Sequence, residues 1–139
     1  MPAKLDGRSI LVVDDDPDIV ATVKMAFEAS GAKVTTARDG NKAVELARSI
    51  NPDLIILDMM MPKRSGFLVM ETLKPQRKAG TKPFVIMITA NEGKRHEQYA
   101  RYLGVDEYVN KPFSMDMILE RSCELLGGDF SEPDHAPPK

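Results

Sequence analysis

The sequence predicts an α/β fold in which five parallel strands form a doubly wound sheet with helices on both faces. Short runs rich in Val and Ile alternate along the chain with longer segments of helical periodicity. Such alternation implies right-handed crossovers and a parallel sheet. The 139 residues suffice for one hydrophobic core and are too few for two ordinary domains. At this length we expect the flavodoxin-like strand order 2-1-3-4-5.

The predicted strands are short apolar runs of the kind that a parallel sheet buries on both faces. The first four strands contain five residues each, and the fifth is shorter. They are SILVV (9–13), KVTTA (33–37), DLIIL (53–57), FVIMI (84–88) and EYV (107–109).

The first predicted helix, 17–30, has recognisable signals at both ends. Asp16 is a good N-cap, Pro17 suits the first helical position, and Gly31 follows the last turn. Its apolar residues recur at helical spacing and form one stripe. We therefore expect this helix to pack one face on the sheet.

The remaining helices are predicted from the same periodicity. Asn51 and Pro52 end the second helix, and Ser114 caps the last. The fourth is expected to carry Tyr99, Ala100 and Leu103 on one face. The predicted ranges are about 41–50, 66 to about 75, about 93–103 and about 115–126.

Composition limits the function. The net charge of -2 argues against nucleic-acid binding through overall positive charge, and the single cysteine, Cys123, excludes an intramolecular disulfide. No apolar run approaches the roughly 20 residues of a membrane helix, and the start lacks the apolar core of a signal peptide. We expect a cytoplasmic location without membrane association.

The expected organisation is an N-terminal extension (1–8), one folded domain (9–126) and a disordered tail or truncated linker (127–139).

Carboxylates end two strands that are neighbours in the predicted order. Asp14 and Asp15 follow the first strand, and Asp58 follows the third. Ligands of such sheets bind at the carboxyl ends of the strands. Crowded carboxylates repel one another unless a cation bridges them. Oxygen-only ligands at modest number favour Mg²⁺.

Two further polar residues follow the fourth and fifth strands. Lys111 offers a mobile positive charge that could meet an anion, and Thr89 offers a hydroxyl. A carboxylate opposite a metal and a cation can accept a phosphoryl group and form an aspartyl phosphate. Asp58 has the position for that role.

Four motifs occur in an order typical of a known family: VVDDD (12–16), LDMMMP (57–62), ITA (88–90) and YVNKPF (108–113). Together they resemble the receiver domain of bacterial two-component response regulators, in the single-domain form typical of chemotaxis regulators. The resemblance covers about residues 9–126. It implies that a histidine kinase or histidine phosphotransfer protein phosphorylates Asp58. It also implies that Mg²⁺, or Mn²⁺ as a substitute, is held by Asp14, Asp15, Asp58 and the main-chain carbonyl of Met60.

The same resemblance implies a switch mechanism. Phosphorylation draws the Thr89 hydroxyl toward the phosphoryl oxygens that Lys111 binds, and Tyr108 rotates into the vacated space. The face formed by the fourth helix, fifth strand and fifth helix then changes and controls a downstream protein target or output domain, or forms a homodimer. Such a domain catalyses its own phosphorylation and dephosphorylation and is otherwise not an enzyme. A cis bond before Pro112 is also implied.

Alternatives remain at this stage. A flavin mononucleotide carrier would need a Ser/Thr/Gly-rich phosphate loop where VVDDDPD stands. A haloacid-dehalogenase-like phosphatase would need a second aspartate at Met60. A receiver-like interaction module would lack one of the acidic residues, and an ion-pair network among Asp14, Asp15, Asp58 and Lys111 would be purely structural. The chain could act as a stand-alone regulator, a phosphorelay shuttle or the receiver of a larger protein.

Overall fold

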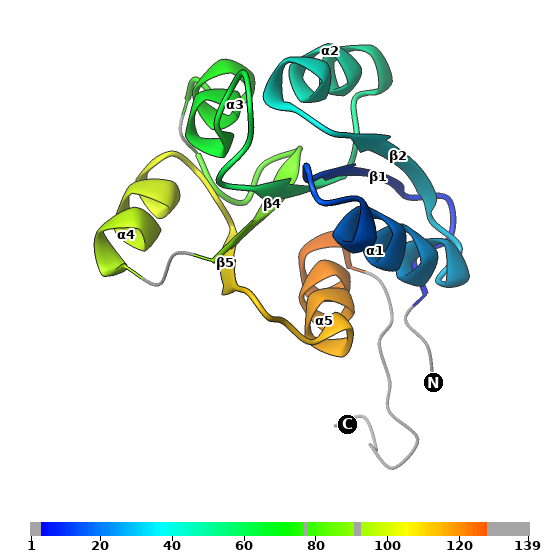
Figure 1. The fold of residues 1–139 in the computed structure, drawn as a ribbon. Coiled ribbons are helices and arrows are strands. Elements are labelled where there is room, and N and C mark those ends of the chain that lie inside the picture. Colours follow the sequence, from blue (N-terminus) through cyan, green and yellow to red (C-terminus); the bar gives the residue numbers. More distant parts are fainter. Residues whose placement is uncertain (1–3, 77, 91–92, 128–139) are drawn as a thin grey trace.

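The computed structural model describes residues 4–76, 78–90 and 93–127. Within these residues five parallel strands form one sheet with helices on both faces, as shown in Figure 1. The order β2-β1-β3-β4-β5 confirms the prediction. The strands are β1 (Ser9–Val13), β2 (Lys33–Ala37), β3 (Leu54–Asp58), β4 (Phe84–Thr89) and β5 (Glu107–Asn110). The helices are α1 (Pro17–Ala29), α2 (Gly40–Ile50), α3 (Gly66–Leu73), α4 (Lys94–Tyr102) and α5 (Met115–Leu126).

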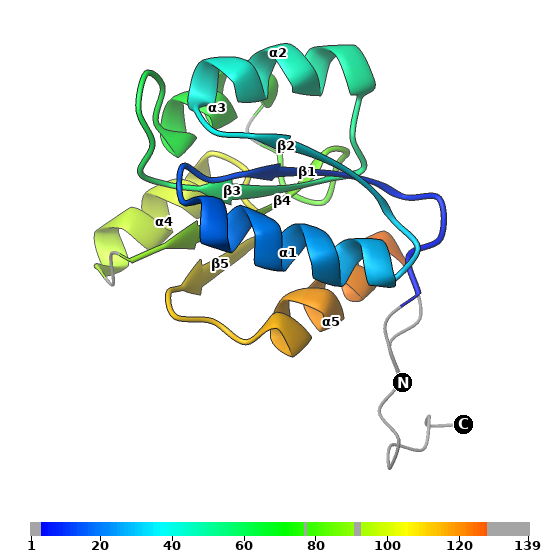
Figure 2. The same ribbon diagram turned by 45° about the vertical axis from the view of Figure 1, so that its right-hand side comes forward.

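The central strands are buried on both faces because successive side chains alternate across the sheet. In β3, Leu54 and Ile56 join the core formed with α1 and α5, whereas Ile55 and Leu57 join the core formed with α2, α3 and α4. Figure 2 shows α1 and α5 on one side of the sheet and α2 and α3 on the other. Since β3 has no solvent-facing side, a charge is accommodated only at its end.

The helix ends follow the predicted capping chemistry, with small shifts. The side chains of Asp16 and Ser114 accept hydrogen bonds from N–H groups of the first turns of α1 and α5, as predicted. Helix α1 ends at Ala29, one residue earlier than predicted. Helix α2 begins at Gly40, because Asp39 caps it through the N–H of Lys42 at 2.8 Å.

The three residues predicted to share one face of α4 differ in their burial. Ala100 and Leu103 are fully buried, but Tyr99 is 40% exposed. Its ring packs edge-on against Phe67 of α3 with centroids 4.9 Å apart, and its hydroxyl donates to Glu71 at 2.9 Å. Tyr99 therefore joins α3 to α4 at the surface.

The structure describes residues 4–8 of the predicted N-terminal extension and only one residue of the predicted tail. Leu5 lies in the predicted N-terminal extension, yet it is buried in the α1–α5 core and its N–H donates to Ser30 at 2.8 Å. The predicted tail lies outside the described residues except for Gly127. Among the described helices, none combines the length and hydropathy needed to cross a bilayer.

Candidate functional site

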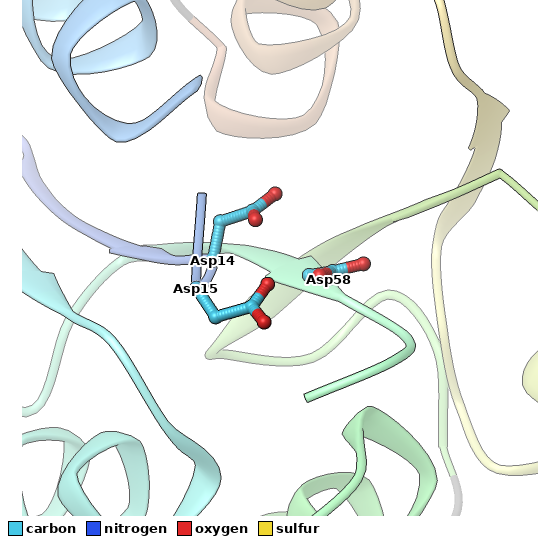
Figure 3. Close-up of side chains that lie close together, drawn as sticks. All are labelled: Asp14, Asp15 and Asp58. Carbon is cyan, nitrogen blue, oxygen red and sulfur yellow. The ribbon is translucent and has the colours of Figure 1, made fainter. Parts of the chain in front are cut away.

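Three carboxylates meet at the carboxyl ends of β1 and β3 (Figure 3). Val13 pairs with Leu57 in the sheet, so the next residues, Asp14 and Asp58, lie side by side where the strands end. Ligand oxygens of Asp14, Asp15 and Asp58 all lie within 4.8 Å of one another. Asp14 is 2% exposed and Asp58 is 4% exposed, whereas Asp15 is exposed. The predicted convergence is confirmed.

Lys111 closes the site from the opposite side. Its Nζ lies 3.1 Å from Asp14 Oδ2 and 3.6 Å from Asp58 Oδ1. The Lys111–Pro112 bond is cis, as predicted, and the Lys111 N–H donates to Thr89 at 2.8 Å. Burial alone would lower the pKa of Lys111, but Asp58 and Asp14 outweigh it and raise that pKa. The ammonium is therefore charged at neutral pH.

The Asp58 carboxyl has an unusual acidity. Burial, and then the charge of Asp14, raise its pKa from 3.8 to about 6, against the opposing effects of Lys111 and the Met60 N–H. The charge of Lys111 therefore offsets only part of the free-energy cost of ionising the buried Asp58 carboxyl beside Asp14. Binding of a further cation would stabilise the ionised form of Asp58.

Substituting Asp58 is expected to stabilise the metal-free protein in a pH-dependent way. The folded pKa lies above the unfolded value, so the protonated form contributes stability at low pH, and this is lost as pH rises through about 6. Asp58→Asn should therefore raise the free energy of unfolding by about 1–2 kcal/mol at about pH 8, and by much less at about pH 4.5. Urea denaturation in EDTA at both pH values measures the difference. A gain that is independent of pH would contradict the assigned origin of the pKa shift.

The two predicted switch residues contact each other. Thr89 is fully buried at the end of β4, and a side-chain hydrogen bond links it to Tyr108 of β5. The Tyr108 hydroxyl also lies 3.9 Å from the sulfur of Met59. Burial raises the Tyr108 pKa, the bond to Thr89 lowers it, and the charge of Glu97 raises it. Tyr108 also packs against the core cluster to which Ala100 of α4 belongs.

Met60 lies in the loop between β3 and α3. Its side chain is 65% exposed, and its N–H donates to Asp58 Oδ1 at 3.3 Å. This contact keeps the Met60 backbone beside the acidic group. The Met60 carbonyl as a metal ligand stays a prediction.

The donor set fits a hard divalent cation. All three side chains that meet at the site offer carboxylate oxygens, and two of them are buried. Mg²⁺ binds oxygen ligands and usually needs only one or two protein carboxylates in addition to water. The exposed position of Asp15 leaves one side of the group open to solvent. Asp14, Asp15 and Asp58 are therefore suited to hold Mg²⁺.

Sequence reasoning missed two residues that shape this site. A Cβ at Gly66 would lie 2.6 Å from the Asp58 carbonyl oxygen, so glycine lets α3 begin directly against the β3 end. Arg64 bonds to both α2 and α3. Gly66 could have been recognised from the sequence, because it is a glycine at the first helical position after the Ser65 cap. No local pattern predicts the contacts of Arg64.

Comparisons with known proteins agree with the geometry. A model of the response regulator receiver domain family matches residues 10–122. The chain is 35% identical over 125 residues to "Probable transcriptional regulatory protein TcrX" of Mycobacterium tuberculosis, covering 88% of this chain and 52% of that protein. It is 39% identical over 120 residues to "Alkaline phosphatase synthesis transcriptional regulatory protein PhoP" of Bacillus subtilis, covering 86% and 49%. It thus spans about half the length of these curated relatives.

A similar solved structure is the receiver domain of the Francisella response regulator 1452. The two share 32% sequence identity and a TM-score of 0.79. The match covers 87% of this chain and 98% of that one.

Proposed function

Because the chain belongs to the response regulator receiver domain family, we propose that it is a signalling switch in which Asp58 accepts a phosphoryl group. One observation carries the proposal: Asp58 lies with Asp14, Asp15 and Lys111 at the carboxyl ends of neighbouring strands. A buried carboxylate opposite a cation is the arrangement that aspartyl phosphate formation needs. Apart from forming and hydrolysing this phosphoaspartate, the domain is expected to catalyse no other reaction.

Asp58 is the nucleophile in this proposal. With a pKa of about 6, its carboxyl is mostly ionised at neutral pH and more basic than an ordinary aspartate. An Asp58 oxygen attacks phosphorus, a new O–P bond forms, and the donor leaves with the electrons of its bond to phosphorus. Lys111 stands where it can neutralise charge on the transferred group. Attack of water on the phosphoaspartate later releases phosphate and resets the switch.

Mg²⁺ is the proposed cofactor, and Mn²⁺ is a suitable substitute. Asp14, Asp15 and Asp58 would hold it, together with the main-chain carbonyl of Met60. When bound, the ion would offset the negative charge that gathers on the phosphoryl oxygens. The Asp16 N–H donates to Asp14 Oδ1 at 2.9 Å, and this bond orients the Asp14 carboxylate for its role.

Thr89 and Tyr108 form the proposed switch. A phosphoryl group on Asp58 would compete with Tyr108 for the Thr89 hydroxyl, and a charged acceptor makes the stronger hydrogen bond. Tyr108 would then change its position, and the surface of α4, β5 and α5 would change with it. Such a device needs only two states whose populations the new bond shifts.

The partners follow from the family. A histidine kinase or histidine phosphotransfer protein would supply the phosphoryl group. A downstream protein target or an output domain would read the α4-β5-α5 surface, and a phosphorylation-dependent homodimer through this surface is a further form. In two relatives named as transcriptional regulators, the part that matches this chain makes up about half of the protein. We assign DNA contacts to such output domains and none to this domain.

The protein is expected to gain one phosphoryl group when incubated with acetyl phosphate and Mg²⁺. Removal of the metal with EDTA should slow the reaction more than about tenfold, and Mn²⁺ should restore it, because the acidic group repels the donor when no cation is bound. Intact-mass spectrometry over time measures the gain. No gain, with Mg²⁺ binding shown separately by calorimetry, would favour a phosphorylation-independent interaction module. Continuous turnover of a phosphate monoester would favour a phosphatase instead.

A further inference from the structure

The loop of residues 59–65 connects the proposed phosphoacceptor to α3. Backbone hydrogen bonds fix Met59, the first residue of the loop, and Gly66, the residue after its end. The Met59 N–H donates to Ile88 of β4 at 2.9 Å, and the Gly66 N–H donates to Met59 at 2.9 Å. The Met60 side chain is exposed, and its N–H donates a long hydrogen bond of 3.3 Å to Asp58 Oδ1. Because this bond is long, contacts made by the rest of the loop must add to the restraint on Met60.

Arg64 ties this loop to two helices. Its Nε donates to Asn41 Oδ1 in the first turn of α2 at 3.1 Å, and its Nη1 donates to Thr72 Oγ1 of α3 at 2.8 Å. Thr72 in turn donates to the Leu68 carbonyl at 2.9 Å, which orients its hydroxyl. A planar guanidinium can span two acceptors in this way, whereas a lysine ammonium is a point charge on a flexible stem.

The backbone of the same segment rests on the start of α2. A Cβ at Gly40 would overlap the Arg64 carbonyl oxygen, so only glycine allows this approach. The Pro62 carbonyl accepts from Arg64 at 2.7 Å and from Gly40 at 3.5 Å. Lys63, which has φ 68°, pairs with Asp39 at 3.8 Å. The second half of the loop is thus docked, and Arg64 supplies the side-chain contacts that hold it there.

We propose that Arg64 is a positioning residue that sets the affinity of the acidic site for its divalent cation. It does so by holding the loop whose Met60 carbonyl would complete the metal site. This inference rests on the proposed function. Groups that hold a metal ligand in place commonly change metal affinity by about 10–100-fold when they are lost. Among the described residues, the hydrogen bonds of the Arg64 side chain join it to Asn41 and Thr72 and not to the carboxylates of the acidic group, so its effect would be transmitted through the loop.

Arg48 offers a matched control. It lines the same surface hollow of about 600 Å³ as Arg64. It carries the same charge, but it is exposed and makes no hydrogen bond or ion pair with any described residue. Replacing either arginine by methionine removes one positive charge from the same surface. Only Arg64→Met removes the two bonds to α2 and α3.

The test is Mg²⁺ binding by isothermal titration calorimetry to the metal-free protein. Arg64→Met is expected to raise the Mg²⁺ dissociation constant about tenfold, whereas Arg48→Met should change it less than about twofold. Urea denaturation confirms that each variant is folded at the titration temperature. Equal affinities for Arg64→Met and wild type, or equal losses for the two arginine variants, would overturn the proposal.

Three further variants separate hydrogen bonding from charge. Asn41→Ala and Thr72→Val each remove one acceptor of Arg64 and leave its charge, so each should raise the dissociation constant by about two- to fourfold. Arg64→Lys keeps the charge but cannot bridge both acceptors, and it should resemble Arg64→Met. Wild-type affinity in Arg64→Lys would show that charge alone acts and would overturn the positioning role.

Failure of the proposed function gives a different result. If wild type binds Mg²⁺ but gains no phosphoryl group from acetyl phosphate, the phosphoacceptor role is wrong, and the Arg64 effect on Mg²⁺ affinity is judged by the titrations alone. If wild type binds no Mg²⁺, the role of Arg64 is overturned. Calorimetry and mass spectrometry on the same preparations distinguish the two failures.

Discussion

Asp58→Asn is expected to take up no phosphoryl group under conditions that label the wild type, a loss of more than about 10³-fold in rate. The carboxylate oxygen of Asp58 is the proposed nucleophile, and an amide oxygen does not form a stable phosphoryl adduct. The substitution keeps the shape of the side chain and removes charge from a crowded acidic group. A folding defect is therefore not expected to explain the loss.

The control is Asp116→Asn. Asp116 is an exposed residue in the first turn of α5 and makes no contact with the acidic group. This variant should be labelled like wild type, as followed by intact-mass spectrometry over time. Peptide mapping of the labelled wild type should place the phosphoryl group on the segment that contains Asp58. Undiminished labelling of Asp58→Asn would assign the acceptor to another residue, and mapping would identify it.

Much of the fold could be predicted because its signals are local. The run SILVV and the buried strand that ends in Asp58 are apolar enough to require burial on both faces, and that implies a parallel sheet. Asp16 and Ser114 marked two helix starts correctly because capping uses neighbouring N–H groups. The exposure of Tyr99 was not predictable, because spacing along a helix shows which residues share a face but not where that face meets a neighbouring helix.

The candidate site was predictable to a similar extent. Asp14 and Lys111 follow strands and Asp58 ends one, and the strand order alone brings such residues to one edge of the sheet. The role of Arg64 could not be predicted in the same way. Its partners lie on α2 and α3, and the distances depend on how these two helices pack. A sequence pattern gives no measure of that packing.

Lys74→Met is expected to lower the free energy of unfolding by about 3 kcal/mol. Lys74 follows α3 and is 3% exposed. Its Nζ donates to the carbonyl oxygens of Thr81, Pro83 and Gly104 at 3.0, 3.1 and 3.3 Å. Methionine fills a similar volume and donates no hydrogen bond. The variant would leave the end of α3, the segment before β4 and the segment between α4 and β5 without their shared contact.

A buried carboxylate adds to this cost. Asp106 Oδ2 lies 4.0 Å from Lys74 Nζ, and both side chains are 4% exposed. Burial lowers the pKa of Lys74, and the charge of Asp106 opposes that effect. Asp106 also accepts from the N–H groups of Gly80 and Val85 at 2.6 and 2.8 Å, so it cannot easily turn to solvent. Removing Lys74 therefore leaves a buried charge without its counterion.

Urea denaturation of Lys74→Met and Lys82→Met at neutral pH measures the difference. Lys82 lies in the same connection before β4 and pairs with Asp53 at 3.3 Å, but its side chain is 47% exposed. Its loss should cost less than about 1 kcal/mol because water screens an exposed pair. Equal destabilisation by the two substitutions would contradict a special role for the buried ammonium.

Adding Asp106→Asn to Lys74→Met separates the two sources of the cost. If the uncompensated charge of Asp106 dominates, the double variant should recover more than about 1 kcal/mol of the loss, because an amide oxygen can still accept from the backbone. If the three carbonyl groups dominate, the double variant should be no more stable than Lys74→Met.

Lys74 lies near the starts of β4 and β5, and the acidic group lies at the opposite ends of the strands. Folded Lys74→Met should therefore still accept a phosphoryl group at the wild-type rate, and a loss of labelling would show that the two ends of the sheet are coupled.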